Sequence, residues 1–466
     1  MQLIYKDFDA TISNINNTLR INESFDLIYR TITIGEKSAC LYFIDGFVKD
    51  DIMQKLQDYF SGLTKEDMNT DAHSFLKKLP YVEADMTDSL DSFKTNIFSG
   101  VTGLIIDGFD NAILIDCRTY PARGVDEPDK DKVLRGSRDG FVETIVMNAA
   151  LIRRRIRSEN LTIKMMNVGS VSKTDVALCY MDNTVDKKKL KYIEDKINSI
   201  TVSSLTMNQE SLAECLHKKK WLNPFPKFKY SERPDTTASA ILEGHIVILV
   251  DNSPASMIIP TTFFDVIEEA DDYYFPPITA TYLRLSRFII TIASLLVTPI
   301  YLFLMQNEHL IPEWLSFIKI TDDINVPIFL QLIILEIAID GLKLAAVNTP
   351  NMLNTPLSVI AGLILGESAV SSGWFNDSTM LYMAFVAFGN FTHGSFELGY
   401  AWKLFRIMLL TLIWLFNGWG FIAGIIIIIG CLFTNKTVTG DSYMYPLFPF
   451  SAKKMCNILL RPKKGE

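Results

Sequence analysis

Charged residues are distributed very unevenly along this chain of 466 residues. It carries 45 lysines and arginines and 53 aspartates and glutamates, and 77 of these 98 residues lie in Met1–Arg287. The 179 residues from Phe288 onward hold only 21 of them, in long apolar runs. Such runs suit a hydrocarbon environment, whereas a chain rich in charge suits water. The sequence therefore predicts a polar N-terminal part followed by a membrane domain.

The apolar part divides into runs of membrane-spanning length. Phe288–Asn307 is uncharged over 20 residues, enough to cross a hydrocarbon core of roughly 30 Å. Ile407–Asn435 is uncharged over 29 residues and has Asn-Gly-Trp-Gly in its middle, so we expect two spans joined by a tight turn there. The other expected spans are Pro327–Val347, Leu357–Gly373 and Ser378–Phe396. We predict about six spans, and an even number places both ends on one side.

Basic residues beside the spans indicate which side that is. Arg284 and Arg287 precede the first span, Lys403 and Arg406 are expected in an inside loop, and the loop Glu308–Asp323 is net acidic. The C-terminal tail carries Lys453, Lys454, Arg461, Lys463 and Lys464. The positive-inside rule therefore places the polar part and the tail on the cytoplasmic side.

The polar part alternates strand-like and helix-like segments, which predicts a mixed α/β (α+β) fold of two subdomains. The stretches GLIIDGFDNAILIDC and GHIVILVDNSPASMIIP are predicted hairpins, and residues 5–36 are mostly polar with helical apolar spacing. The proline-rich segment 221–237 is expected to be extended. The predicted domains are a first α/β cytosolic subdomain (1–90), a second one that includes the proline-rich wrapping segment (91–262), a membrane-approach segment (263–287), a helical transmembrane domain (288–435) and a basic cytosolic tail (436–466).

Three charged residues interrupt the second predicted span. Glu336, Asp340 and Lys343 stand at i, i+4 and i+7, so they share one helix face. A charge at the centre of a bilayer costs on the order of 3 kcal/mol on insertion scales, so this face should meet protein or water. The pattern suits an intramembrane polar network that either lines a pathway or joins helices structurally, and both interpretations remain open.

The third predicted span has small residues roughly along one side. Such residues favour close helix packing, and they also suit a helix that lines a narrow pore. Glu367 would add a negative potential that favours cations. Close packing is the better supported reading of the two on sequence alone. The candidate pore-lining residues are Ser358, Ala361, Gly362, Leu365, Glu367, Ala369 and Ser372.

A dense basic stretch, RGSRDGFVETIVMNAALIRRRIRS, stands in the polar part of an acidic chain with a net charge of -8. It reads as a loop and a helix, Phe141–Arg157, whose basic end favours its own terminal carbonyls. Acidic residues nearby favour a salt-bridge network at a subunit or subdomain interface over lipid or phosphate binding. The overall acidity argues against nucleic acid. The candidate interface residues are Arg135, Arg138, Asp139, Arg153, Arg154, Arg155 and Arg157.

The sequence offers no signal of catalysis. The six cysteines are scattered and form no CxxC pair, and the five histidines have no metal-ligand spacing. No phosphate-binding loop, dinucleotide fingerprint or nucleophile elbow occurs. We therefore expect no enzyme activity, no cofactor and no metal.

Several long motifs resemble the spore-germination GerA family, A-subunit type. They are the basic stretch above, VGSVSKTDVALCYMD, ERPDTTASAILEGHIVILVDNSPASMIIPTTF and ELGYAWKLFR, and the resemblance runs from about residue 35 to about residue 450. The stretch YPARGVDEPDKDKVLRGSRDGF is similar to the stage V sporulation AF branch of that family.

The resemblance implies a location and partners that composition alone does not show. It implies an integral protein of the inner membrane of the bacterial endospore, with the soluble part facing the core. It also implies a homo-oligomer, with a pentamer as the expected form, that works with other integral membrane germination proteins, monovalent cations and the lipid bilayer. Three functions stay open: a gated cation channel, a non-conducting membrane scaffold that transmits a signal in a germinant receptor complex, and, less favoured, an ion-coupled transporter. The acidic residues in the spans favour conduction.

Overall fold

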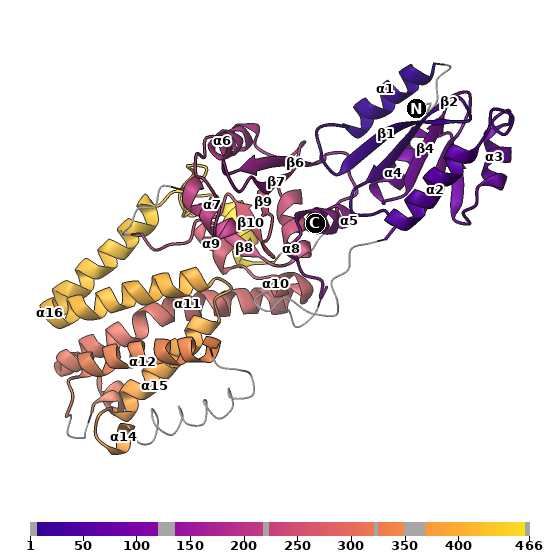
Figure 1. Cartoon of the computed structure of the whole chain (residues 1–466). Helices are drawn as coiled ribbons and strands as arrows, with labels where there is room; N and C mark the ends of the chain where they lie inside the picture. Colours follow the sequence, from indigo (N-terminus) through magenta and orange to yellow (C-terminus); the bar gives the residue numbers. More distant parts are fainter. Residues whose placement is uncertain (1–6, 120–135, 218–222, 321–324, 349–368, 462–466) are drawn as a thin grey trace. The chain divides into compact units, whose positions relative to one another are not determined.

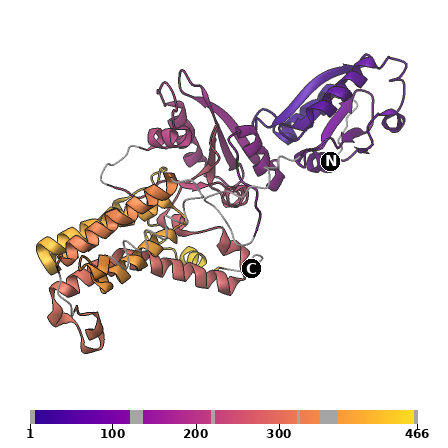
Figure 2. The same cartoon turned by 60° about the horizontal axis from the view of Figure 1, so that its bottom comes forward.

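The computed structural model describes residues 7–119, 136–217, 223–320, 325–348 and 369–461. The chain forms two compact units, each described here by itself. The first, the sheet unit, contains residues 1–218 and 228–260; the second, the helical unit, contains residues 219–227 and 261–466. Figures 1 and 2 show the strands gathered in the sheet unit and the long helices in the helical unit.

A five-stranded antiparallel sheet forms the first half of the sheet unit, in the order β1-β2-β4-β5-β3. Its strands are β1 (Leu27–Ile34), β2 (Lys37–Ile44), β3 (Ala84–Thr87), β4 (Thr102–Ile106) and β5 (Ala112–Ile115). The predicted hairpin GLIIDGFDNAILIDC is confirmed as β4 and β5. Because β4 pairs with β2, this sheet extends to Ile115, and the subdomain boundary expected near residue 90 moves beyond it. The helical prediction for residues 5–36 is wrong after α1 (Phe8–Leu19), since β1 follows.

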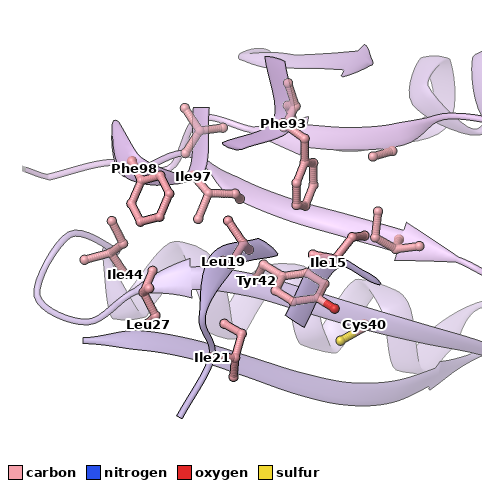
Figure 3. Close-up of a cluster of buried hydrophobic side chains, with 14 of the residues drawn as sticks. Ile15, Leu19, Ile21, Leu27, Cys40, Tyr42, Ile44, Phe93, Ile97 and Phe98 are labelled. Atoms are coloured by element: carbon pink, nitrogen blue, oxygen red, sulfur yellow. The ribbon is translucent and has the colours of Figure 1, made fainter. Parts of the chain in front are cut away.

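Alternation along β2 explains why this sheet is covered by helices on both faces. Cys40, Tyr42 and Ile44 point to one face, where they join α1 and α4 (Leu90–Phe98) in one apolar core. Figure 3 shows Tyr42 and Cys40 of β2 among side chains of α1 and α4. Ala39 and Leu41 point to the other face, where they meet α2 (Asp50–Gly62) and α3 (Ala72–Lys78). The result is a three-layer α/β/α arrangement.

The second half of the sheet unit repeats the first. Its antiparallel sheet has the order β6-β7-β9-β10-β8, which is the same order strand for strand. The strands are β6 (Leu161–Val168), β7 (Thr174–Met181), β8 (Lys229–Ser231), β9 (Ile246–Val250) and β10 (Ser256–Ile259). The predicted hairpin GHIVILVDNSPASMIIP is confirmed as β9 and β10.

The helices repeat as well. The second half contains α5 (Ile145–Arg155), α6 (Lys187–Asn198), α7 (Asn208–Leu216) and α8 (Pro234–Leu242). Both halves therefore follow one plan, a helix, a β-hairpin, two helices, a strand, a helix and a second hairpin. The first and last helix of each half share one core with the sheet, α1 with α4 and α5 with α8. The sheet unit is thus a tandem repeat of one α/β fold, and its mixed α/β class is as predicted.

The helical unit begins with short segments and continues in long helices. Its elements are α9 (Phe263–Ile267), α10 (Asp271–Tyr274), α11 (Pro277–Gln306), the 3-10 turns η1 (Glu308–Leu310) and η2 (Glu313–Ile318), α12 (Ile328–Asn348), α14 (Ala369–Ser371), α15 (Asp377–Phe391), α16 (Phe396–Thr434) and α17 (Ala452–Leu459). Among the described residues, two helices are long and apolar enough to cross a membrane, α11 and α16. The helical class is as predicted, while the count of six spans stays a prediction.

Helix α16 reverses direction in its middle, at the place where the sequence predicts a tight turn. Asn417 has φ 51° and ψ -129°, which is not helical. A Cβ placed on Gly424 would lie 2.5 Å from Leu409 Cδ2, whereas 15 residues of continuous helix would separate them by roughly 22 Å. The two arms, residues 396–416 and 418–434, therefore lie side by side, and Figure 1 shows them meeting at the label α16.

The proline-rich segment belongs partly to each unit. Residues 223–228 form neither helix nor strand, as expected of an extended segment, and β8 and α8 follow. Phe225 belongs to the helical unit, where its ring lies 5.5 Å from that of Trp402 and 6.0 Å from that of Tyr443. Lys227 donates hydrogen bonds to Asn435 Oδ1 and to the carbonyl of Lys436. The part of the segment that belongs to the helical unit is therefore anchored beside the C-terminal end of α16.

Candidate functional site

Four charged side chains meet inside the helical unit. Glu336 of α12 accepts a hydrogen bond from Arg406 Nε at 2.5 Å, and its other carboxylate oxygen lies 3.3 Å from Lys403 Nζ. Lys403 also lies 2.5 Å from Asp340 Oδ2 and donates to the Glu336 carbonyl at 2.8 Å. The spacing explains why the two pairs meet. Glu336 and Asp340 are four residues apart on α12, and Lys403 and Arg406 are three apart on α16, so each pair lies on one face of its helix. We call these four residues the intramembrane cluster, after the sequence prediction that this segment spans the membrane.

The cluster joins three helices. Arg406 Nη1 donates to the carbonyl of Ser294 on α11 at 2.8 Å, so α11, α12 and α16 meet at one guanidinium. Arg406 is 0% and Glu336 is 1% exposed. Removing one partner of such a buried pair typically costs about 3–5 kcal/mol, because the other charge is left without compensation. The cluster therefore ties the helical unit together through groups that need one another.

One side of the cluster is open. The Asp340 side chain is 33% exposed, unlike that of Glu336 at 2%. Within the described part of the chain, Asp340 Oδ1 and Arg406 Nη2 have no hydrogen-bond partner. Lys343, one turn further along α12, lies with its Nζ 4.7 Å from the centre of the Phe391 ring. Polar groups in an apolar environment need water or another protein segment as hydrogen-bond partners.

The sequence anticipated only one half of this cluster. Glu336, Asp340 and Lys343 were expected on one face of α12, and the structure brings Glu336 and Asp340 together through two basic residues. The expectation that Lys403 and Arg406 lie in a loop is wrong, because both are buried in the first arm of α16. The signal that could have revealed it is the basic pair in AWKLFR, whose spacing of three residues places both side chains on one helix face, as a spacing of four does for the two acids.

Most of the candidate pore-lining residues fall outside the described chain. These are Ser358, Ala361, Gly362, Leu365 and Glu367. Ala369 begins α14, and Ser372 follows that helix and donates to the Ala369 carbonyl at 3.1 Å. Pore lining by this set therefore stays a prediction.

A second group of charges surrounds Asp272 of α10, shortly before α11 begins. The Asp272 carboxylate is 0% exposed and accepts hydrogen bonds from Arg287 at 3.0 and 3.1 Å and from Arg284 at 3.3 Å. Arg284 also donates to Glu268 Oε1 at 2.6 Å. These arginines therefore clamp the segment 268–272, which precedes the first long apolar helix, onto that helix.

The basic stretch of the sheet unit lies at the joint between the two repeats. Arg153 is 0% exposed and donates from Nε to Asp26 Oδ2 at 2.7 Å and from Nη2 to Asp26 Oδ1 at 3.1 Å. Asp26 precedes β1 in the first repeat, while Arg153 is in the first helix of the second. A backbone hydrogen bond crosses the same joint, because Phe25 N donates to the Ile163 carbonyl at 3.0 Å.

The other residues of the interface set are less buried. Arg155 donates from Nη2 to both Asp139 oxygens at 2.7 and 2.8 Å. Burial raises the pKa of Asp139, but the hydrogen bonds from Arg155 and Ser137 outweigh it and hold that pKa below its usual value. Arg138, Arg154 and Arg157 are exposed, and Arg135 lies outside the described residues. Within one chain the stretch thus serves the contact between subdomains, and a role between subunits stays a prediction.

Taken together, a tandem α/β sheet unit and a helical unit with two candidate membrane helices define a membrane-associated protein with a large polar domain. The chain matches the family described as Bacillus/Clostridium GerA spore germination protein over residues 13–464. It therefore belongs to the GerA spore germination family, the family of the germinant receptor A subunits.

Relatives of this family from Bacillus subtilis (strain 168) cover nearly the whole chain. "Stage V sporulation protein AF" is 35% identical over 463 residues, covering 99% of this chain and 94% of that protein. "Spore germination protein KA" is 27% identical, covering 96% of this chain and 84% of that protein. The crystal structure of the N-terminal domain of the A subunit of the Bacillus megaterium spore germinant receptor GerK3 is 26% identical, with a TM-score of 0.44, and covers 56% of this chain and 98% of that domain.

Proposed function

We propose that this chain is a subunit of an oligomeric ion channel that releases cations across a spore membrane during germination. The observation that carries the proposal is the open side of the intramembrane cluster, where Asp340 is 33% exposed on a helix whose residues are mostly apolar. An exposed carboxylate within a bilayer needs water or a neighbouring protein chain. A homo-oligomer arranged around a hydrated path supplies both, and negative charge along such a path favours cations.

The proposal includes six spans. Helices α11, α12 and α15 and the two arms of α16 supply five, and the apolar run Leu357–Gly373 supplies the sixth from sequence. Helix α12 is 21 residues long, which suffices to cross a bilayer, and its three charges meet protein groups or face the path. Helix α15, with 15 residues, crosses a thinner part or is completed by neighbouring residues.

The remaining parts of the proposal concern place and partners. The protein is located in the inner membrane of the endospore, with the sheet unit and tail facing the core, because the basic tail and Arg284 and Arg287 flank the same side of α11. It works with other integral membrane germination proteins and has no enzyme activity, cofactor or nucleic-acid partner. The family of germinant receptor A subunits supports a role in the germination response itself.

A second candidate function is a scaffold that transmits a signal and conducts nothing. It is favoured by Glu336, whose buried carboxylate is held by two basic side chains and whose role is then purely structural. Cation efflux from liposomes that contain the purified oligomer separates the two functions. Efflux that requires the protein supports the channel, whereas no efflux from a correctly inserted oligomer supports the scaffold.

A further inference from the structure

Residues 443–461 form a strap with an exposed side that is apolar and basic. Tyr443 is 0% exposed in the core of the helical unit, and Arg461 fixes the other end by donating to the carbonyls of Tyr273, at 2.6 Å, and Phe275. Between these two anchors, the short helix α17 contacts α11, and Figure 2 draws it in yellow near the C-terminus. Arg284 of α11 donates to the carbonyls of Asn457 and Ile458, at 3.0 and 3.2 Å.

The strap leaves large apolar side chains uncovered. Phe448 is 60% exposed, Phe450 is 69% and Leu460 is 53%, with Leu447 at 40%. Lys453 and Lys454 are exposed on the first turn of α17, three and four residues after Phe450 in the sequence. We call Leu447, Phe448, Phe450, Lys453, Lys454 and Leu460 the tail surface. Apolar rings together with lysines on one short amphipathic segment are typical of a chain that lies in the plane of a membrane interface.

The position of the strap along α11 places it at the level of the lipid headgroups. Helix α11 has 30 residues and is about 45 Å long, so it exceeds a hydrocarbon core of roughly 30 Å. Its uncharged part begins at Phe288. The part before Phe288, which contains Arg284 and Arg287, is the length that the hydrocarbon core does not need. The strap contacts this earlier part, since Arg461 N donates to Thr281 Oγ1 at 3.1 Å.

The apolar half of the tail surface is continuous with a helix that can cross the membrane. The Phe448 ring lies 6.0 Å from that of Phe433, in the last turns of α16, and Phe433 is itself 42% exposed. Tyr282 and Ile278 on the protruding part of α11 are 69% and 82% exposed. Lipid that covers Phe433 would therefore also contact Phe448, and Lys453 and Lys454 follow Phe448 in the sequence.

We propose that the tail surface binds the membrane interface through acidic phospholipids, with the aromatic side chains in the acyl boundary and the lysines on the headgroups. The charge complementarity names this occupant, because lysines beside an anionic leaflet gain roughly fivefold in partitioning each. Two further lysines, Lys463 and Lys464, follow in the sequence. This inference rests on insertion of the helical unit in a bilayer, as proposed above, and does not require that the protein conduct ions.

Fluorescence quenching in nanodiscs tests the proposal on the full chain. Cys456 of α17 is exposed and accepts an environment-sensitive fluorophore once Cys215→Ser and Cys431→Ala remove the other accessible thiols. The bilayer contains brominated phosphatidylcholine with increasing phosphatidylglycerol. We expect quenching that rises with phosphatidylglycerol, and we expect Lys453→Gln/Lys454→Gln to shift the half-maximal phosphatidylglycerol content upward several-fold.

Two further variants keep the test decisive. Lys188→Gln/Lys191→Gln makes the same charge change on exposed lysines of α6 and should leave the curve unchanged. Phe448→Ser/Phe450→Ser should lower quenching at every lipid composition, and unaltered elution of each variant shows that it is folded. Quenching that changes neither with the phosphatidylglycerol content nor with the lysine substitutions would overturn the role of acidic lipid. No quenching in any bilayer overturns contact with the membrane, whatever the flux measurements show.

Discussion

The guanidinium of Arg153 holds the carboxylate of Asp26 through two hydrogen bonds, of 2.7 and 3.1 Å, across the joint between two copies of one α/β fold. Nη2 also donates to Ser24 Oγ at 3.2 Å and to the Leu161 carbonyl at 3.0 Å, and Nη1 donates to the Ser158 carbonyl at 2.9 Å. Both charged side chains are essentially buried, at 0% and 1% exposure. The pair is therefore a fixed part of the sheet unit, and its loss should lower the stability of that unit as a whole.

Replacing Arg153 by Met should destabilise the sheet unit strongly. Asp26 would be left buried without its cation, which typically costs about 3–5 kcal/mol. Denaturant unfolding of the protein measures this loss. The matched control is Arg154→Met, which removes the same group from an exposed position on the same helix and should change stability far less. Equal effects of the two substitutions would contradict the assigned role of the buried pair.

The intramembrane cluster should show strong coupling between Glu336 and Arg406. Each single change, Glu336→Leu or Arg406→Leu, leaves a buried charge without its partner and should lower the thermal midpoint in detergent. The double variant removes both charges and should be less destabilised than the sum of the single ones, by about 1–3 kcal/mol. Glu313→Gln, on the exposed turn η2, is the control for loss of an acid. Additive single effects would mean that the pair does not interact in the folded protein.

Asp139 should contribute to the acid sensitivity of the sheet unit. Its pKa is held below the usual value by Arg155 and Ser137 in spite of partial burial. A lowered folded-state pKa stabilises the protein above the unfolded value, near about 3.9, and this contribution is lost as pH falls through the folded pKa. Asp139→Asn should therefore flatten the loss of stability in that acidic range. A pH profile of the thermal midpoint that is identical for both proteins would show that the pair contributes nothing.

Sidedness of labelling should follow the proposed six spans. A cysteine introduced at Ser316, in the turn η2 between α11 and α12, should react from the side opposite the sheet unit. The native Cys456 of α17 should react only from the side of the sheet unit. A membrane-impermeant thiol reagent, applied to vesicles of known orientation, measures both. Reaction of the two positions from the same side would require an even number of spans between η2 and the tail.

The sequence was sufficient for the two-part layout and for several elements, because their signals are local. The hairpins β4–β5 and β9–β10 each show two β-rich runs around a turn, and the reversal at Asn417 shows a turn tetrapeptide within an apolar run. The boundary near residue 90 could not be placed correctly, because it depends on the non-local pairing of β4 with β2. The tandem repeat is another feature that was not predicted, although the two hairpin sequences are themselves alike.

The candidate site, too, could be predicted from the sequence only in part. The shared face of Glu336 and Asp340 follows from helical periodicity alone. Their partners do not, since Lys403 and Arg406 were assigned to a loop by counting basic residues beside apolar runs. Near the end of a run, a basic residue can mark a loop or a buried ion pair, and only the packing of α12 on α16 distinguishes the two.

The most direct test of the channel is cation efflux from liposomes that contain the assembled protein, measured alongside the oligomeric state. We expect efflux from the native protein. An Ala361→Phe oligomer should show little efflux, because the larger side chain adds bulk to the path. Glu367→Gln should show reduced efflux, because the negative potential falls while the width of the path is unchanged. Loss of assembly in Ala361→Phe would instead assign this position to helix packing. Normal efflux from an assembled Ala361→Phe oligomer would show that the third predicted span does not line the path beside Asp340. No efflux from a correctly inserted native oligomer would contradict conduction itself.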